Sequence, residues 1–182
     1  QNHAACINEQ FSKITDDGYL RMIEMKVPSN ATAPASGQRD YGTAAFYGCG
    51  TGSPWKSNSQ LISEGCRMEI RARLRGQKNN MGIWLVSDES AGQKSYSEID
   101  ILENPVGPVT GDRAHQTFHT GPTTTDNKTK TANNTINMTE WNIYWVEWRS
   151  DTEVAIGING EETVTLKKSE CTEEEWTFTN AK

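Results

Sequence analysis

Met68-Glu-Ile-Arg-Ala-Arg-Leu74 decides the fold class, because apolar and charged residues alternate along it without error. Side chains of a β-strand point to opposite faces in turn, so this period of two predicts a strand with one apolar and one charged face. Patterns of the same kind predict further strands over residues 19–27, 82–86, 143–148, 153–158 and 162–166. Asn159-Gly160, just before the last of them, is a strong hairpin signal.

Polar, punctuated segments separate these strands and are expected to be loops: residues 29–39, 50–59, 76–80 and 120–139. The run 82–86 is mostly apolar, which predicts a strand covered on both faces. Helical signals are confined to one turn, where Thr172 and Glu175 have the spacing of a capping box. Many short strands with turns between them predict a single all-β domain over residues 1–182, an antiparallel β-sandwich jelly roll of the concanavalin A-like lectin/glucanase type.

The composition argues against several classes of protein. The chain has 182 residues, enough for one domain with a hydrophobic core, and a net charge of -6. Its Lys and Arg residues are scattered rather than clustered, which argues against a nucleic acid partner. No apolar run approaches the roughly 20 residues that a membrane span needs. The chain does not open with a signal peptide, so a secreted protein would be present in its mature form.

Metal ligation is not expected from the cysteines or the histidines. The four cysteines are widely spaced and lack a CxxC pair, which argues against a zinc site. Free thiols and a single disulfide such as Cys49–Cys66 remain alternatives. His115 and His119 lie on a segment that reads as a strand, where four residues separate the Cα atoms by roughly 13 Å. That distance is too long for two ligands of one ion.

Glu98-Ile-Asp-Ile-Leu-Glu103 places three carboxylates on one strongly β-prone segment. Alternation puts Glu98 and Asp100 on one face, where Leu102 would follow them. Glu103 joins that face only if one extra residue is bulged out at Ile101–Leu102. The spacing therefore predicts a β-bulge, with the apolar residues in a core and three acids together on the opposite face.

Three acids on one face have a chemical consequence. Crowding of like charges raises the pKa of at least one carboxyl group, which leaves an acid and a base side by side near neutral pH. Cleavage of a glycosidic bond requires such a pair, whereas most acid-rich segments are simply solvated sheet edges.

Three neighbours of the acids are candidate substrate contacts. Trp84 is equally consistent with core packing and with stacking on the flat face of a sugar ring. Tyr96 shares the carboxylate face by alternation, which favours stacking. His119 is interpreted as a hydrogen-bonding residue of a substrate groove, and a surface histidine whose hydrogen bonds are simply satisfied is the alternative.

Ser97-Glu-Ile-Asp-Ile-Leu-Glu103 resembles the active-site strand of glycoside hydrolase family 16, which includes laminarinases, lichenases, agarases and carrageenases. The extra residue between the acids resembles the laminarinase and agarase form of the motif rather than the lichenase form. Further segments are similar to family motifs in the family's order, over roughly residues 17–181: Asp17-Gly-Tyr-Leu20, Gly65-Cys-Arg-Met-Glu-Ile-Arg-Ala-Arg-Leu74, Gly82-Ile-Trp-Leu85, His119-Thr-Gly121, Tyr144-Trp-Val-Glu-Trp148 and Ile158-Asn-Gly160.

The resemblance implies a retaining endo-hydrolase of a β-linked polysaccharide, either a β-1,3-glucan or an algal β-galactan. Glu98 would be the nucleophile, Glu103 the general acid/base, and Asp100 an assisting acid beside the nucleophile. Catalysis would pass through a covalent glycosyl-enzyme intermediate, which requires carboxyl groups roughly 5–5.5 Å apart. A transglycosylase using the same site and a catalytically silent carbohydrate-binding jelly roll are the alternatives.

The resemblance also implies partners and location. We expect a polysaccharide substrate, no required cofactor, a structural calcium ion as an option, and a monomer that is secreted, periplasmic or at the cell surface. Two features depart from the family. Gln93-Lys-Ser-Tyr96 stands where laminarinases usually have a Trp-Pro pair. Terminal strands usual in the family are not recognised in the chain, and a missing strand would leave an exposed sheet edge.

Overall fold

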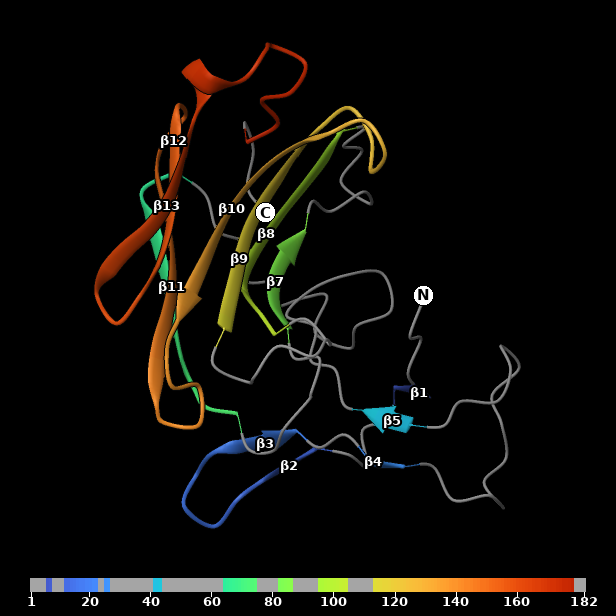
Figure 1. The fold of residues 1–182 in the computed structure, drawn as a ribbon, viewed down its shortest axis with the longest axis vertical. Helices are drawn as coiled ribbons and strands as arrows, with labels where there is room; N and C mark the ends of the chain where they lie inside the picture. The colour runs from blue at the N-terminus through green and yellow to red at the C-terminus, as the bar shows by residue number, and fades with distance from the viewer. Residues whose placement is uncertain are drawn as a thin grey trace. The chain divides into compact units, whose positions relative to one another are not determined.

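The computed structural model describes residues 6–7, 12–22, 25–26, 41–43, 64–74, 82–86, 95–104 and 113–178. The chain divides into two compact units, Gln1–Gly48 and Cys49–Lys182. Figure 1 shows the described strands of each unit. The single domain expected over residues 1–182 stays a prediction.

The described part of the first unit consists of short strands. β1 (Cys6–Ile7) runs parallel to β5 (Tyr41–Thr43), which pairs antiparallel with β4 (Met25–Lys26). β2 (Ser12–Ile14) and β3 (Leu20–Met22) form a hairpin. The single strand predicted over residues 19–27 is therefore wrong. The two halves of that segment, β3 and β4, pair with different partners and belong to different sheets.

Two four-stranded antiparallel sheets make up the described part of the second unit (Figure 1). The front sheet has the order β10-β9-β8-β7, with β7 at Gly82–Val86, β8 at Tyr96–Glu103, β9 at Arg113–Gly121 and β10 at Lys128–Thr135. The back sheet has the order β13-β12-β11-β6, with β6 at Cys66–Ala72, β11 at Asn142–Ser150, β12 at Glu153–Ile158 and β13 at Glu161–Lys167. The predicted antiparallel β-sandwich is confirmed.

The core of the second unit lies between its two sheets, because alternate side chains of each strand point toward the other sheet. Phe178, which follows the last strand, packs against both sheets. Its ring centroid lies 6.2 Å from that of Phe118 on β9 and 6.0 Å from that of Trp148 on β11. The fully buried core side chains include Ile99, Ile101, Leu102, Phe118, Tyr144, Val146, Ile156, Leu166 and Phe178.

Several predicted strands and one turn are confirmed. β6 has the predicted alternation, with its charged side chains exposed and its apolar side chains partly buried. On β11, Tyr144 and Trp148 face the core, whereas Trp145 and Glu147 lie on the outer face of the back sheet. Asn159 and Gly160 form the hairpin turn with φ angles of 53° and 84°.

Two predictions of local structure are wrong. β7 is not covered on both faces, because its residues alternate between exposed and half-buried. The segment 120–139 is not one long loop, because β10 occupies its centre and pairs with β9 along its whole length. The sequence of β10 is polar, so its strand character depends on pairing with β9 rather than on a hydrophobic face.

The capping box at Thr172 and Glu175 forms as predicted. The backbone nitrogen of Thr172 donates to Glu175 Oε2 at 2.7 Å, and that of Glu175 donates to Thr172 Oγ1 at 3.2 Å. The two residues close a turn rather than a helix, while a single 3-10 turn precedes them at Lys168–Glu170.

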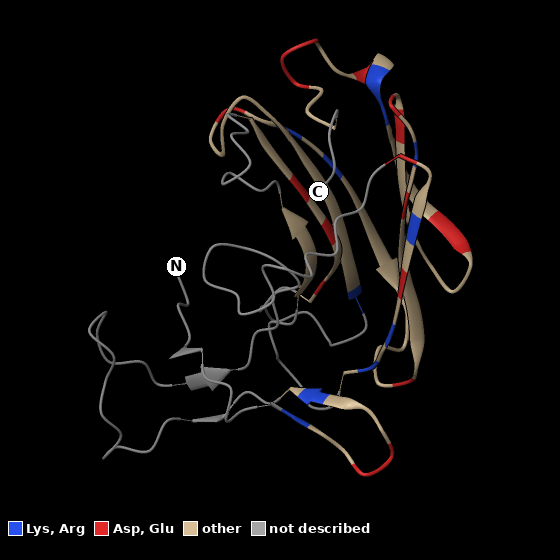
Figure 2. Cartoon of the chain, turned by 180° about the vertical axis from the view of Figure 1, so that it is seen from behind, with Lys and Arg blue, Asp and Glu red and all other residues tan. Residues whose placement is uncertain are grey.

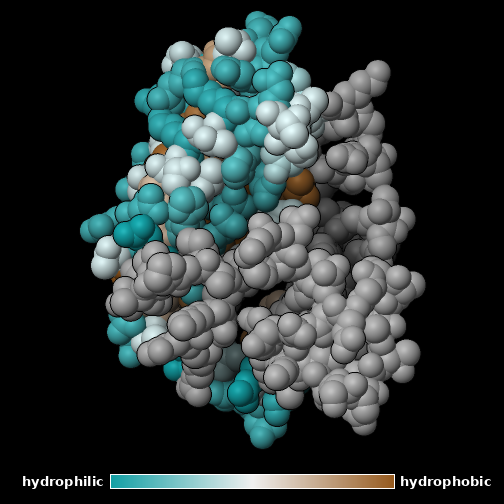
Figure 3. Space-filling view, turned by 45° about the vertical axis from the view of Figure 1, so that its right-hand side comes forward, coloured by the Kyte–Doolittle hydropathy of each residue, from teal (hydrophilic) through white to brown (hydrophobic). Residues whose placement is uncertain are grey.

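The described residues on the face shown in Figure 3 are largely hydrophilic. Teal, the hydrophilic colour, dominates the coloured atoms of the face in Figure 3. None of the helical segments that the structure describes has the length and apolar character needed to cross a membrane.

Candidate active site

The predicted bulge on β8 is present. Asp100 pairs with Thr117 of β9 and Glu103 with His115, so three steps along β8 match two steps along β9. On the other side, Ile83 of β7 pairs with Leu102 and the next residue, Trp84, pairs with Asp100. The register therefore shifts by one residue at Ile101–Leu102 on both sides of β8.

The bulge gathers the three acids on the outer face of the front sheet. Ile101 and Leu102 are both completely buried, while Glu98 and Glu103 are half-buried and Asp100 is only 3% exposed. Figure 2 shows the acidic residues of β8 near the middle of the sheet, with no basic residue on that strand. Three carboxyl groups thus lie close together where partial burial and mutual repulsion both disfavour their charged forms.

These surroundings raise the pKa of both glutamates. Burial, and then the neighbouring charge of Asp100 and a hydrogen bond with it, raise the pKa of Glu98 to about 7. A hydrogen bond between two carboxyl groups requires one shared proton, so Glu98 and Asp100 behave as a pair. Burial, followed by the charge of Asp100, also raises the pKa of Glu103 above its ordinary value. The site can therefore hold and release protons near neutral pH.

His119 is held against the acids. Its Nε2 lies 3.1 Å from Asp100 Oδ2, and its ring centroid lies 6.3 Å from that of Tyr96. The hydrogen bond with Asp100 is the main reason why the pKa of His119 is raised. His119 therefore contacts an acid of the trio directly, while its part in a substrate groove stays a prediction.

An apolar strip on β7 borders the acids. Trp84 pairs with Asp100 and is 47% exposed, and Val86 pairs with Glu98 and is 41% exposed. Trp84 leans over Gly82, where an added Cβ would lie 3.4 Å from Trp84 Cδ1. Core packing, the alternative left open for Trp84, is excluded by this exposure. An open indole beside carboxyl groups is suited to stacking on a sugar ring.

The opposite border of the site, on β9 and β10, is polar and was not predicted. His115 Nδ1 lies 2.8 Å from Asn133 Oδ1, and the hydroxyls of Thr117 and Thr131 lie 3.3 Å apart. These pairs continue the face that carries Asp100 and Glu103. The alternating Thr and Asn residues of 128–135 were the available signal, but their polarity suggested a loop.

The described residues contain no group of three His, Cys, Asp or Glu side chains that could hold a metal ion. Structural calcium stays a prediction. Cys171 has a free, partly buried thiol. Cys49 lies outside the described residues, so the alternative of a Cys49–Cys66 disulfide stays open.

No family model and no curated protein matches the chain by sequence. Several solved structures match the chain by their fold. The endo-β-1,3-glucanase of Pyrococcus furiosus is 18% identical with a TM-score of 0.71, and the match covers 96% of this chain and 65% of that one. The laminarinase of Rhodothermus marinus is 19% identical with a TM-score of 0.67, covering 96% and 66%. A non-specific endo-β-1,3(4)-glucanase of family 16 is 19% identical with a TM-score of 0.68, covering 96% and 62%.

These similarities establish the fold. The chain has the β-sandwich of the family 16 laminarinases and endo-β-1,3(4)-glucanases, so the resemblance read from the motifs is confirmed at the level of the backbone. The chain spans less than two thirds of the length of each of these three proteins.

Proposed function

We propose that the chain is a retaining endo-hydrolase of β-1,3-linked glucan, with its active site on the outer face of the front sheet. The observation that carries the proposal is the bulge on β8, which brings Glu98, Asp100 and Glu103 together, with the pKa of Glu98 and that of Glu103 raised. A binding module that only holds sugar has no use for such a cluster, since the repulsion among three carboxyl groups destabilises the fold.

In the first step, the ionised carboxylate of Glu98 attacks the anomeric carbon of the sugar. A bond forms from a Glu98 oxygen to that carbon as the bond to the glycosidic oxygen breaks. The protonated carboxyl group of Glu103 donates its proton to the departing oxygen. The products are a glycosyl ester on Glu98, a free sugar chain and the carboxylate form of Glu103.

In the second step, a water molecule attacks the same carbon. Glu103 takes one proton from the water, and the ester bond to Glu98 breaks. Two inversions at the anomeric carbon restore its original configuration. Asp100 assists through the hydrogen bond that it shares with Glu98, and His119 holds Asp100 from the other side.

Trp84 and Tyr96 are proposed to bind the sugar. Trp84 is open to solvent and pairs with Asp100, so a ring stacked on its indole would lie beside the acids. Tyr96 lies two residues before Glu98 and adjoins His119. The choice of β-1,3-glucan over an algal β-galactan follows the endo-β-1,3-glucanase and laminarinases that share the fold.

A digestion panel tests the proposal: laminarin, mixed-linkage glucan, agarose, porphyran and carrageenan. We expect oligosaccharides from laminarin, and NMR of the fresh products should show the β-anomer first. Glu98→Gln should release none, while Glu153→Gln, a matched exchange on the back sheet, should act like the parent chain.

Three outcomes would overturn the proposal or part of it. Binding of laminarin without hydrolysis of any substrate would indicate a silent binding module. Release of the α-anomer first would exclude a retaining mechanism. Hydrolysis of agarose or carrageenan but not laminarin would replace the substrate and keep the chemistry.

A further inference from the structure

Asn127 lies next to the candidate site without belonging to the acids or to the aromatic residues. It stands at the end of the turn that joins β9 to β10, two residues before Thr129, which pairs with His119, and it is one of the groups that raise the pKa of His119. His119 in turn bonds to Asp100 through Nε2 at 3.1 Å. Since Asp100 bonds to Glu98, one chain of contacts runs from the turn to the proposed nucleophile.

The turn holds Asn127 firmly. Its amide nitrogen donates to the carbonyl oxygen of Thr124 at 2.7 Å. The backbone nitrogen of Asp126 donates to Thr123 Oγ1 at 2.9 Å, and that of Thr123 donates to the carbonyl oxygen of Asp126 at 3.3 Å. The turn is therefore tied together by its own threonine residues, which orient the Asn127 side chain before any substrate binds.

Gly121 allows this arrangement. A Cβ at Gly121 would lie 2.5 Å from the carbonyl oxygen of Asp126 and 2.6 Å from Asn127 Cα. The turn folds back onto the end of β9 more closely than any other residue would permit. This approach brings Asn127 against Gly121, which lies two residues after His119 on β9.

The hydrogen-bond chemistry determines which atoms meet. The His119 ring has two nitrogens, and Nε2 is used by Asp100. The amide nitrogen of Asn127 is used by the Thr124 carbonyl oxygen, so Oδ1 is the atom that Asn127 can offer to the ring. The same pairing recurs four residues away on β9, where His115 Nδ1 meets Asn133 Oδ1 at 2.8 Å.

We propose that Asn127 is a positioning residue, which accepts a hydrogen bond from His119 Nδ1 and so keeps Nε2–H directed at Asp100. This role rests on the proposed function, because its value to the protein is to hold Asp100 against Glu98. The groups facing His119 are Asp100 and Glu98 from β8, together with Tyr96, Asn127 and Thr129, its partner on β10. Only Asn127 approaches from the turn.

Imidazole NMR tests the contact without any substrate. The chain has three histidines, so a His119→Gln variant identifies the His119 signals. Asn127→Ala should lower the His119 pKa by about one unit, the effect of losing one hydrogen bond to a charged group. Asn127→Asp keeps an acceptor and should leave the His119 pKa at or above its starting value. Asn133→Ala should change His115 and not His119.

Kinetics test the consequence. On laminarin, Asn127→Ala should lower kcat about tenfold, as expected if one pKa unit of stabilisation is lost from the His119–Asp100 pair. KM should change little, and Asn127→Asp should restore most of the rate. Glu153→Gln, on the back sheet, should leave both constants unchanged.

The two proposals fail in different ways. If the parent chain hydrolyses no polysaccharide, the proposed function fails, and the His119 titration still decides whether Asn127 holds the ring. If the parent chain is active but Asn127→Ala leaves the His119 pKa and kcat unchanged, Asn127 has no positioning role. A loss of rate in Asn127→Ala that Asn127→Asp does not restore would also overturn it.

Discussion

The outer faces of the two sheets carry the same kinds of residue in different surroundings. Each face carries a tryptophan that leans over a glycine and a group of carboxylates beside it. On the back sheet, Trp145 is only 2% exposed, because it packs on Gly157 and lies 4.0 Å beneath the Arg67 guanidinium. On the front sheet, Trp84 leans over Gly82 and remains 47% exposed.

The carboxylates differ in the same way. On the back sheet, Arg149 contacts Glu147, Glu153 and Glu162 at 2.8 to 3.0 Å. The pKa of Glu153 is lowered mainly by its hydrogen bond with Arg149, and that of Glu162 by Thr165 and then Arg149. On the front sheet, the acids face each other and two histidines, and the pKa values of Glu98 and Glu103 rise.

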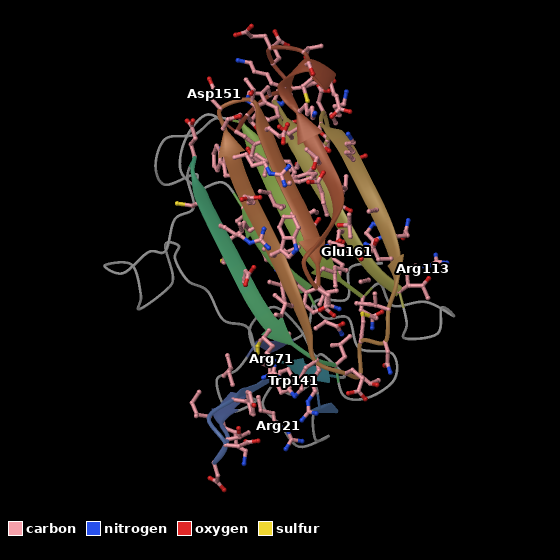
Figure 4. All side chains as sticks on the ribbon, turned by 90° about the vertical axis from the view of Figure 1, so that its left-hand side faces the viewer. Arg21, Arg71, Arg113, Trp141, Asp151 and Glu161 are labelled. Carbon is pink, nitrogen blue, oxygen red and sulfur yellow. The ribbon has the colours of Figure 1, made fainter. Side chains whose placement is uncertain are left out.

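The different surroundings of the carboxylates indicate which of them stabilise the fold and which serve a function. A carboxylate that meets a guanidinium supports the fold, whereas a carboxylate that meets other carboxylates destabilises it and is retained for another reason. Arginines also stack on a second tryptophan of the back-sheet unit, where Arg71 and Arg73 each lie 4.6 Å from the ring centroid of Trp141. Figure 4 shows Arg71 and Trp141 together at one end of the sheet and Asp151 at the other. In the described part of the chain, Arg149 pairs with the carboxylates of the back face, whereas no ion pair joins a lysine or arginine to the acids of β8.

Substitution of the acids should produce the largest difference in activity between the two sheets. Glu98→Ala and Glu103→Ala should each lower laminarin hydrolysis by up to about 10⁴-fold, as expected for loss of a positioned catalytic group. Glu153→Ala on the back sheet should retain full activity. With an activated aryl glycoside, added azide should rescue Glu98→Ala as the α-glycosyl azide and Glu103→Ala as the β-anomer. The reverse pattern would exchange the two roles.

The two tryptophans should respond in opposite ways. Trp145→Ala should destabilise the protein by about 3–5 kcal/mol, since it removes a fully packed aromatic side chain. Trp84→Ala should change stability little but raise KM, because its ring is open. Thermal unfolding and laminarin kinetics on both variants check this. A large loss of stability in Trp84→Ala would show that its indole serves the fold.

Removal of the Asp100 charge should shift the pH dependence of kcat/KM. The ionised form of Glu98 is the one that attacks, so kcat/KM should fall as the pH drops below about 7, where Glu98 takes up its proton. Asp100→Asn removes a neighbouring charge that raises the Glu98 pKa, so this acidic limb should move to lower pH. We also expect a lower maximal rate. An unchanged limb would mean that Asp100 does not couple to Glu98.

Stability should depend on pH through Glu98. Its pKa is raised from 4.5 to about 7 in the folded chain, so its contribution to stability is complete below pH 4.5 and is lost as the pH rises through 7. Glu98→Gln cannot ionise, and it should be more stable than the parent chain at pH 8 and nearly equal to it at pH 4.

Glu153→Gln should show the opposite dependence in the same unfolding experiment. The lowered pKa of Glu153 gives a contribution that is present near neutral pH and lost on acidification. The variant should therefore be less stable than the parent chain at pH 7, with a difference that shrinks in acid. If the stability of Glu98→Gln and that of Glu153→Gln changed with pH in the same direction, the two sheets would not differ in the way that we describe.

The smallest effect is expected from Arg149→Gln. Its partners are partly exposed, so the loss should be about 1 kcal/mol at low ionic strength and should shrink as salt is added. Activity should not change, because the back-sheet network lies on the far side of the core from the acids. Urea unfolding at two salt concentrations measures the loss, and a salt-independent result would indicate packing rather than charge.

Local periodicity predicted much of the fold and the centre of the candidate site. Strand alternation at Met68–Leu74 and the Asn159-Gly160 turn depend on neighbouring residues only, so the sequence displays them directly. The bulge is also local, because counting residues between Asp100 and Glu103 is enough to require it. The prediction failed at β10, which was expected to be a loop, since a polar strand is recognised only by the partner that it pairs with.

The sequence by itself therefore determined that three acids lie on one strand, and that Glu103 joins the face of the other two only through a bulge. Only the tertiary structure decided what stands across from them. Trp84 is 47% exposed, and within the described ranges no arginine stacks on it, whereas Trp145 is covered by Arg67. The turn that closes on Gly121 brings Asn127 to the end of β9, the strand that carries His119. Alternation is a property of adjacent residues, whereas these contacts join strands whose pairing depends on the whole sheet.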